Sequence, residues 1–583
     1  MSILEKVYYP NDLKKLAISE METLAQEIRD LLIKKVNTTG GHMGPNLGFV
    51  EPTIALHYVF NTPEDKIVYD VSHQCYTHKI LTGRKEGFLK PENYAKFSGY
   101  TNPDESEYDC FVVGHTSTSV SLACGLAKAR DLKGGNENVI AVIGDGSLSG
   151  GEAYEGLNNA AELGSNIIII VNDNEMSIAP NFGGLYSNLR LLRETNGKAE
   201  CNFFKAMGFD YYYLENGNNT AELIELFKKV KDIKHPVVVH LHTLKGKGLA
   251  PAEADKEAFH WILPGTLDKK DTPEQASENY FTVTTDYILN KAKQDKTVFA
   301  ISPATPGAYG FTREFREKMG KQYTDVGIAE EHAVACASAM AKAGAKPILS
   351  ILSSFIQRTY DQLSQDLCLN NSPATILVHW AGLSGADMTH LGCFDIPMIS
   401  NIPNLVYLAP ANKEEYLAML DWSVEQTQHP VAIRVPFGAF ISTGVADNTD
   451  YSKLNKYCMV EKGSDVAVIA LGTFFEKGKE LKRVLKESAG IDVTLINPKF
   501  ITGIDTEMLE SLKENHRLVV TLEDGILDGG FGEKITRFYG NSVMKVLNFG
   551  AKKEFTDRVP LEEIYKLNHL TTDLMIQDIK NLL

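Results

Sequence analysis

Two short motifs place oxygen ligands directly after predicted strands. A Gly-Asp-Gly motif occupies residues 144–146 and an Asn-Asp-Asn motif occupies residues 172–174, and each follows a β-branched apolar run. A predicted helix and strand separate the motifs, so both turns are expected at the carboxyl edge of one parallel sheet, where open α/β sheets bind ligands. The carboxylate of Asp145, the amide oxygen of Asn174 and the backbone carbonyl of Met176 are hard donors that suit Mg²⁺.

The first motif also has a plain alternative. A lone Gly-Asp-Gly is typical of a strand-to-helix turn with a capping aspartate. The second motif at this spacing favours a site for Mg²⁺ and a diphosphate instead. Glycines at 144 and 146 let the backbone approach a diphosphate without a Cβ in the way.

A glutamate at a predicted helix start is the second candidate for chemistry. The segment 325–332 reads Asp-Val-Gly-Ile-Ala-Glu-Glu-His and leads into an alanine-rich stretch. Glu330 could exchange a proton with a cofactor ring as a general acid or base. Taken alone, a carboxylate in a first helical turn more often complements the helix dipole. Because the metal–diphosphate motif already indicates a cofactor site, we retain the acid–base role as a hypothesis for Glu330.

The elements around these motifs alternate between strand and helix patterns. A first helix, capped by Asn11 or Asp12, should run to the glycines at 40–41. Strands are predicted over 139–143, 166–171, 237–241, 348–352, 375–378, 466–471 and 493–496, and helices over 153–163, over 356–369 and up to residue 485. The pattern predicts an α/β protein with three doubly wound domains and mainly parallel sheets.

We place the domains at residues 1–275, 276–450 and 451–583, with polar linkers over 263–277 and 447–456. The chain has 583 residues, 59 Lys and Arg against 75 Asp and Glu, and a formal net charge of −16. This acidic balance argues against nucleic acid and anionic membranes as partners. Eight scattered cysteines and a charged N-terminal stretch without a long apolar run favour the cytoplasm.

Segments along nearly the whole chain resemble the 1-deoxy-D-xylulose-5-phosphate synthases, a branch of the transketolase superfamily. Among the motifs are GDGSLSGGEAYEGLNNA, NDNEMSI, GIAEEHAV and SSFIQRTYDQ. The similar segments are residues 40–84, 105–119, 144–160, 172–178, 327–334, 353–362, 385–395 and 402–410. The resemblance implies a diphosphate-binding domain, a pyrimidine-binding domain and a C-terminal domain, in that order.

The resemblance also implies thiamine diphosphate and Mg²⁺ as cofactors. It assigns Asp145, Asn174 and the Met176 carbonyl to the metal. Glu330 resembles the partner of the aminopyrimidine ring, and Phe355 resembles the aromatic residue stacked on that ring. Further cofactor-binding positions that it implies are His73, Gly114, His115, Thr116, Gly146, Ser147 and Lys245.

The resemblance also implies which residues act in the reaction or bind the substrate. The implied catalytic residues are Glu330, His42, His73, His260, Arg358 and His390, and the implied substrate residues are Arg358, Asp387 and His390. Any one of these histidines, taken alone, is more typically a surface or satisfied core residue. Together with His115, the histidines at 42, 73 and 260 predict a polar lining whose near-neutral pKa suits proton transfer.

The implied activity is that of a thiamine diphosphate-dependent transferase. Pyruvate would be decarboxylated and its two-carbon unit passed to an aldehyde, either glyceraldehyde 3-phosphate or another one. Two alternatives stay open: a transketolase-like transfer from a ketose donor, and a thiamine diphosphate-binding protein without catalysis. The expected partners are these small molecules and, because the family's cofactor sites accompany a large subunit interface, a second copy in a homodimer.

The chain departs from the family pattern where the acceptor phosphate is held. A family tyrosine is Leu352 here, and two family arginines are Trp380 and Phe437. The segment 385–392 is one residue shorter than usual, and the stretch between 178 and 237 is also shorter. We weigh a pocket rebuilt for another acceptor against drift, in which Arg434, Arg358 or another cation still binds the phosphate.

Overall fold

The structure, a computed structural model, describes residues 2–269, 278–436 and 440–583. It divides into two compact units. Unit 1 is Met1–Gln275 with Gly327–Ala329, and unit 2 is Ala276–Val326 with Glu330–Leu583. Unit 2 contains two sheets, and the division into three domains stays a prediction. Phe437 and the end of the predicted linker, residues 270–277, lie outside the described residues.

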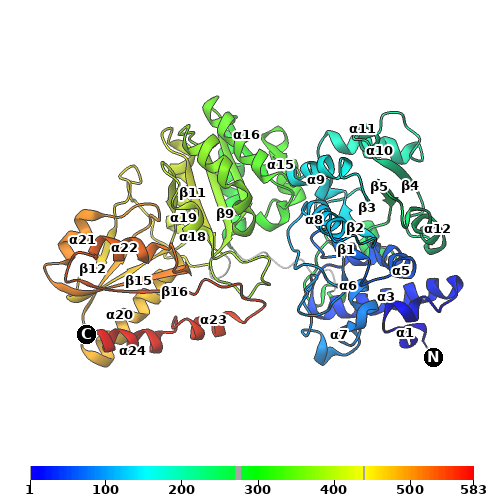
Figure 1. Ribbon diagram of the computed structural model, residues 1–583. Helices are drawn as coiled ribbons and strands as arrows, with labels where there is room; N and C mark the ends of the chain where they lie inside the picture. Colours follow the sequence, from blue (N-terminus) through cyan, green and yellow to red (C-terminus); the bar gives the residue numbers. More distant parts are fainter. Residues whose placement is uncertain (1, 270–277, 437–439) are drawn as a thin grey trace. The chain divides into compact units, whose positions relative to one another are not determined.

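Unit 1 is built on one five-stranded parallel sheet in the order β1-β2-β3-β5-β4 (Figure 1). Its strands are β1 (Lys66–Tyr69), β2 (Val139–Gly144), β3 (Ile167–Asp173), β4 (Asp210–Leu214) and β5 (Pro236–His242). Three of them confirm the strands predicted in this region. Their near-continuous apolar sequences fit a parallel sheet that is buried on both faces.

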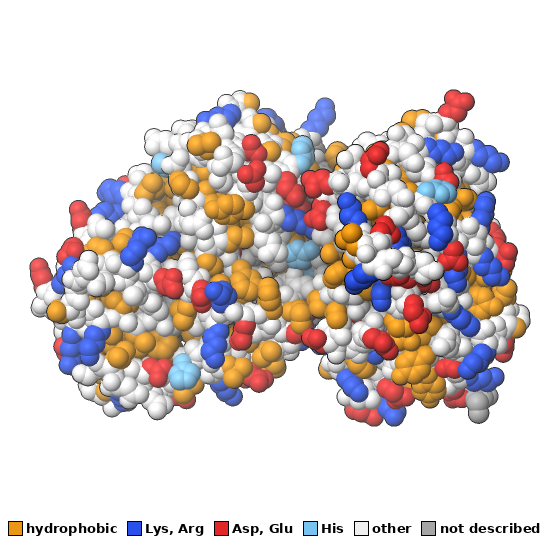
Figure 2. Space-filling model, in the orientation of Figure 1, with side chains coloured by type: hydrophobic (Ala, Val, Ile, Leu, Met, Phe, Trp, Pro, Cys, Tyr) orange, Lys and Arg blue, Asp and Glu red, His pale blue; other side chains and the backbone are white. Residues whose placement is uncertain are grey.

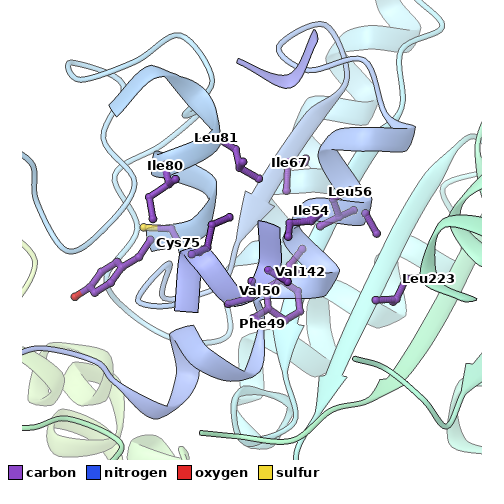
Figure 3. Packing of buried hydrophobic residues seen from close by; sticks show 14 of the residues in the cluster. Phe49, Val50, Ile54, Leu56, Ile67, Cys75, Ile80, Leu81, Val142 and Leu223 are labelled. Carbon is purple, nitrogen blue, oxygen red and sulfur yellow. The ribbon is translucent and has the colours of Figure 1, made fainter. Parts of the chain in front are cut away.

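Helices cover both faces of this sheet. One face packs against α3 (Ile18–Thr39), α5 (Val50–Val59) and α12 (Thr220–Val230), and the other packs against α8 (Ser119–Leu132), α9 (Gly151–Ala161) and α10 (Gly184–Glu194). Figure 3 shows part of the first core, where Ile54 and Leu56 of α5 lie near Ile67 of β1. The unit is therefore doubly wound, and its strand ends are fixed from two sides.

Unit 2 holds two further sheets, which also combine strands with flanking helices (Figure 1). The first has the order β10-β11-β9-β8-β6-β7 and is entirely parallel. Its strands are β6 (Val298–Ser302), β7 (Tyr323–Asp325), β8 (Lys346–Leu352), β9 (Thr375–Ala381), β10 (Val406–Leu408) and β11 (Val431–Pro436). Helices α14 (Tyr280–Gln294), α16 (Glu330–Lys342) and α19 (Lys413–Glu425) contact it.

The second sheet of unit 2 has the order β12-β14-β13-β15-β16, with only the β12–β14 pairing antiparallel among the described strands. Its strands are β12 (Cys458–Glu461), β13 (Asp465–Ala470), β14 (Val493–Asn497), β15 (His516–Ile526) and β16 (Lys545–Ala551). Helices α20 (Phe475–Ala489), α22 (Phe531–Tyr539) and α24 (Thr572–Leu582) pack with it. The predicted class, α/β with mainly parallel sheets, is confirmed.

Two predicted helices differ from the structure. The long first helix does not follow Asn11 or Asp12. The Asp12 carboxylate instead accepts hydrogen bonds from the amides of Tyr8 and Tyr9 and caps the start of the short helix α2 (Pro10–Leu13). The long helix α3 begins at Ile18, where the Glu20 carboxylate accepts the Ala17 amide at 2.9 Å. The helix predicted over 356–369 begins at α17 (Ser353–Ile356) and widens into π-type turns at Gln362–Cys368.

Acidic and basic side chains are interspersed over the face that Figure 2 draws. Within the described ranges, no helix has both the length and the apolar character needed to cross a membrane. All eight cysteines are free thiols.

Candidate functional site

The two ligand motifs meet at the carboxyl ends of β2 and β3. Gly144 is in register with Asn172, and the Asp145 amide donates to the Asn172 carbonyl at 3.1 Å. Asp145 and Asn174 follow at once, and both are buried. A Cβ added at Gly146 would lie 2.9 Å from the Cβ of Ser177, so only glycine fits this close approach.

The polar atoms here fit a hard cation. The Oδ1 atom of Asn174 is buried without a hydrogen-bond partner, which is the state expected of a ligand oxygen. Burial, and then the nearby Asp173 carboxylate, raise the pKa of Asp145, so a cation would relieve its desolvated charge. Among the described residues no three His, Cys, Asp or Glu side chains gather as a metal site. One carboxylate with amide and carbonyl oxygens therefore suits Mg²⁺ better than zinc.

Three of the four predicted histidines form a cluster in unit 1. The ring centroids of His42, His73 and His260 lie 5.0 to 5.6 Å apart. The Lys245 Nζ atom donates to the Ser177 carbonyl at 2.6 Å and lies 3.0 Å from Nδ1 of His260. Burial lowers the pKa of Lys245 to about 7 and holds that of His260 well below its usual value. An anion beside Lys245 would therefore favour its protonated form.

The fourth histidine, His115, lies with Gly114 and Thr116 on the loop that precedes α8. This loop is ordered by Asp70, at the end of β1. The Asp70 carboxylate accepts the amides of Ser117 at 2.8 Å and Ser119 at 3.0 Å. Sequence reasoning missed Asp70, although its place directly after a strand was the signal that identified Asp145.

The same loop is joined to the Gly-Asp-Gly motif. Ser117 Oγ donates to the Ser147 carbonyl at 2.8 Å. Ser117 has a φ of 75°, a left-handed conformation that is costly for serine and that the two Asp70 contacts hold in place. The strand-end carboxylate thus orders both loops that carry the predicted diphosphate contacts.

Unit 2 carries the predicted pyrimidine contacts. Glu330 is the first residue of α16 and is 3% exposed. Its Oε2 atom is buried without a hydrogen bond, and the Arg358 guanidinium lies 3.6 Å away. Burial raises the pKa of Glu330 to about 7, against the opposing effect of Arg358. This carboxyl group can therefore hold or release a proton near neutral pH, as a general acid or base requires.

The raised pKa predicts a pH-dependent cost of Glu330 to stability. The folded pKa of about 7 lies above the ordinary value of 4.5, so the folded state binds more protons between these two values. Stability is therefore lost as pH rises from about 4.5 to 7. We expect Glu330→Gln to stabilise the protein by about 1–3 kcal/mol at pH 8 and hardly at all at pH 4.5. Calorimetric melting at both pH values checks this, and an equal change in melting temperature at both would contradict it.

Phe355 and the predicted substrate residues also lie in unit 2. The rings of Phe355 and His390 meet edge to face, with centroids 5.6 Å apart. His390 Nδ1 lies 3.4 Å from the Asp387 carboxylate, whose pKa is lowered to about 2 because hydrogen bonds from His390 and Thr389 outweigh burial. Arg358 adjoins Glu330, so the structure brings the predicted residues of this unit together in two groups, one of Phe355, His390 and Asp387 and one of Glu330 and Arg358.

The departures from the family pattern have different surroundings. Leu352 is 5% exposed and belongs to a hydrophobic core of unit 2, so its side chain does not line an open surface. Trp380 is 39% exposed and sits in a bulge, because β11 pairs with His379 and then with Ala381. A φ of 56° there re-aims the side chain, as bulges commonly do.

Arg434 is not available to bind a phosphate. Its guanidinium donates to both carboxylate oxygens of Asp395, at 2.6 and 3.0 Å, and to the Asp524 carbonyl at 2.7 Å. The side chain is buried, and Tyr407 donates a further hydrogen bond to Asp395. The idea that Arg434 replaces the missing cations is therefore wrong, since its charge is already paired inside unit 2.

Two acidic residues of the C-terminal part support these segments without a signal in the sequence. The Asp524 carboxylate accepts the Leu383 amide at 2.9 Å, and the Asp557 carboxylate accepts the Met388 amide at 3.3 Å. Both contacts hold the stretch that carries Asp387 and His390. Each spans more than 140 residues of chain, so no local pattern points to it.

Comparison with known proteins gives full-length similarity. The family model described as 1-deoxy-D-xylulose-5-phosphate synthase matches residues 4–201 and 194–243. The models described as the transketolase pyrimidine binding domain and the transketolase C-terminal domain match residues 279–440 and 456–573. Among solved structures, a transketolase from Pichia stipitis is similar at 16% identity over 97% of both chains, with a TM-score of 0.46.

Several curated relatives are named 1-deoxy-D-xylulose-5-phosphate synthase. The protein from Halothermothrix orenii is 38% identical over 99% of this chain and 96% of its own length. The protein from Carboxydothermus hydrogenoformans is 38% identical over 100% of this chain and 99% of its own. The protein from Clostridium tetani is 37% identical over 98% of each.

Proposed function

This chain belongs to the 1-deoxy-D-xylulose-5-phosphate synthase family, and from that membership we propose that it decarboxylates pyruvate and transfers the two-carbon unit to an aldehyde. Its cofactors are thiamine diphosphate and a divalent metal ion, which we take to be Mg²⁺. The observation that carries the proposal is that the chain has both kinds of group this reaction needs. Unit 1 has buried oxygen ligands after β2 and β3, and unit 2 has the buried Glu330, whose pKa is raised to about 7.

Unit 1 offers the residues that would hold the metal and the diphosphate. Asp145, Asn174 and the Met176 carbonyl would bind Mg²⁺, a proposal supported by the unpartnered Asn174 oxygen. Lys245 would face the diphosphate as a buried cation, and the loops at 114–116 and 146–147 would surround it. Bound thiamine diphosphate supplies the electron sink that allows pyruvate to lose carbon dioxide and its two-carbon remainder to join an aldehyde.

Unit 2 offers the residues that would act on protons and position substrate. Glu330 would hold a proton at a ring nitrogen of the cofactor, because its pKa of about 7 permits both forms at neutral pH. Phe355 would stack on that ring. Arg358 would keep the Glu330 carboxylate partly ionised, and Asp387 would hold His390 in one orientation through the 3.4 Å contact.

The histidine cluster would handle protons in unit 1. Burial lowers the pKa of His260 and keeps its ring uncharged, so the ring would form a hydrogen bond with a substrate hydroxyl and orient it. Its neighbours His42 and His73 extend this polar surface, with centroids within 5.6 Å. The Lys245 Nζ atom, 3.0 Å from Nδ1 of His260, would further lower the pKa of this histidine when the lysine is protonated.

Pyruvate-dependent release of carbon dioxide tests the proposed reaction. Purified protein with thiamine diphosphate and Mg²⁺ should release carbon dioxide from pyruvate and form a deoxyketose when an aldehyde is added. Turnover of a ketose donor without pyruvate would support the transketolase-like alternative. Binding of the cofactor without either reaction would support the non-catalytic one.

We also propose that the acceptor differs from the phosphorylated aldehyde that the family name suggests. Trp380 brings no charge to a position where the family has arginine, Arg434 is paired with Asp395, and Arg358 already faces Glu330. A phosphate placed near Trp380 would lose water without gaining the arginine that the family has at that position. Phe437, the other replaced arginine, lies outside the described residues.

The acceptor proposal predicts that kcat/KM for glyceraldehyde 3-phosphate is no higher than for unphosphorylated glyceraldehyde. Trp380→Arg, alone or with Phe437→Arg, should raise it by about 10–100-fold, because an arginine–phosphate pair contributes about 1.5–3 kcal/mol. Trp380→Gln is the matched control, since it removes the ring without adding charge. Strong preference of the wild type for the phosphorylated aldehyde would reject the proposal and leave an ordinary member of the family.

A homodimer and a cytoplasmic location complete the proposal. The family's cofactor sites accompany a large subunit interface, which supports the homodimer, and the scattered free cysteines fit a reducing compartment, which supports the location.

A further inference from the structure

A segment outside the predicted cofactor contacts touches both ligand loops of unit 1. This segment, which we call the brace, runs from Asn181 to Arg193. It contains all of α10 (Gly184–Glu194) except the final residue. The brace lies in the stretch between 178 and 237 that is shorter than in the family. Its contacts reach the loops after β2 and β3, which carry the proposed metal ligands.

Asn181 makes the most direct of these contacts. Its Nδ2 atom donates to Oδ2 of Asp145 at 2.6 Å, which fixes the orientation of the proposed ligand carboxylate. Its other amide atom, Oδ1, is buried without a hydrogen-bond partner, as is Oδ1 of Asn174. A buried carbonyl oxygen without a partner lowers stability unless a hydrogen-bond donor or a cation binds it.

Two more residues of the brace hold the same loops. The Tyr186 hydroxyl lies 3.2 Å from the Asp145 carbonyl and 3.3 Å from the Gly146 carbonyl, and it can donate to either. Arg193 donates to the carboxylates of Asp173 and Glu175, which flank Asn174 on both sides. Tyr186 and Arg193, both on α10, therefore restrain residues beside both proposed metal ligands.

The brace is itself fixed to the core. Leu189 and Leu192 of α10 are fully buried in the core that also contains Ile143 and Val171, the apolar residues just before the two motifs. The distances from Asn181, Tyr186 and Arg193 to the loops are thus set by sheet packing rather than by a loosely tethered loop.

We propose that Asn181 is a positioning residue for the metal, orienting the Asp145 carboxylate and offering its own Oδ1 to the metal or a water bound to it. The proposal rests on the proposed function only in requiring that unit 1 binds Mg²⁺ with thiamine diphosphate. Outer contacts to metal ligands typically change metal affinity by about 10–100-fold when removed.

The test is the Mg²⁺ dependence of cofactor binding, measured by calorimetry on the whole chain without substrate. Asn181→Ala should raise the apparent Kd for Mg²⁺, at fixed thiamine diphosphate, by about 10–100-fold. At saturating Mg²⁺ and cofactor, its KM for pyruvate should stay within about threefold of wild type, because a positioning residue acts through metal occupancy. Mn²⁺ binding followed by electron paramagnetic resonance gives a second readout that needs no turnover.

Asn188→Ala is the matched control, because Asn188 lies on α10 within the brace and contacts Cys201 and Phe203 instead of the ligand loops. It should bind Mg²⁺ as the wild type does. If Asn181→Ala does not fold, Asn181→Ser removes the amide but keeps a small polar side chain, and it should still weaken Mg²⁺ binding several-fold. Unchanged Mg²⁺ affinity in the folded variants would reject the role of Asn181 while leaving the proposed function intact. Absence of binding in the wild type would reject both.

Discussion

Glu330→Gln is expected to lower the rate of pyruvate-dependent carbon–carbon bond formation by about 10²–10⁴-fold, the usual contribution of a positioned acid or base. The amide that replaces the carboxyl group would keep the shape of the side chain but could not exchange a proton. The proposed metal and diphosphate contacts lie in unit 1, so thiamine diphosphate should still bind. The measurement pairs steady-state rates with calorimetric binding of the cofactor, and with proton exchange at the reactive carbon of bound cofactor.

Glu331→Gln is the control for this variant. Glu331 is the next residue of α16 and is only partly buried, whereas Glu330 is 3% exposed. A near-normal rate in Glu330→Gln with a large loss in Glu331→Gln would transfer the role to the neighbour. Because burial of the ionised Glu330 costs stability at neutral pH, the inactive variant should also melt at a higher temperature.

Asp145→Ala is expected to weaken thiamine diphosphate binding by more than about 100-fold, since it removes the one carboxylate of the proposed metal site. The raised pKa of Asp145 means that its buried charge is a cost without a cation. The variant should therefore fold at least as stably as the cofactor-free wild type. What it should lose is the rise in melting temperature that Mg²⁺ and the cofactor cause by binding to the folded state.

Asp104→Ala serves as the comparison, because it deletes a carboxylate of the same unit that lies away from the two ligand motifs in the sequence. It should retain the full cofactor-induced rise in melting temperature. An undiminished rise in Asp145→Ala would place the metal elsewhere and remove the basis of the proposed function in unit 1.

The sequence predicted those features that depend on local pattern. The strands at β2 and β3 follow from β-branched apolar runs, and the meeting of Asp145 with the Asn172–Asn174 turn follows from parallel topology. The first helix was misplaced because a carboxylate such as Asp12 can cap backward, onto Tyr8 and Tyr9, as readily as forward. Such competition between local hydrogen bonds has no distinct sequence pattern.

Contacts between distant side chains were beyond reach from the sequence. Arg434 looked like a spare cation until its pairing with Asp395, 39 positions away, became visible. Leu352 replaces a family tyrosine where the acceptor phosphate is held, although the packing of β8 buries its side chain. Asn181 carried no signal at all, since an asparagine in a turn is ordinary and only its 2.6 Å contact with Asp145 distinguishes it.

The exposed indole in the bulge of β9 has a practical use. The chain has three tryptophans, and two of them, Trp261 beside His260 in unit 1 and Trp380 in unit 2, are 49% and 39% exposed. Indole emission shifts with the polarity of its surroundings, so ligands arriving near either residue should change the intrinsic fluorescence. Replacing each in turn by phenylalanine would separate the two signals. The protein thus carries its own optical reporters, one in each unit, and occupancy of the two regions can be followed without a label.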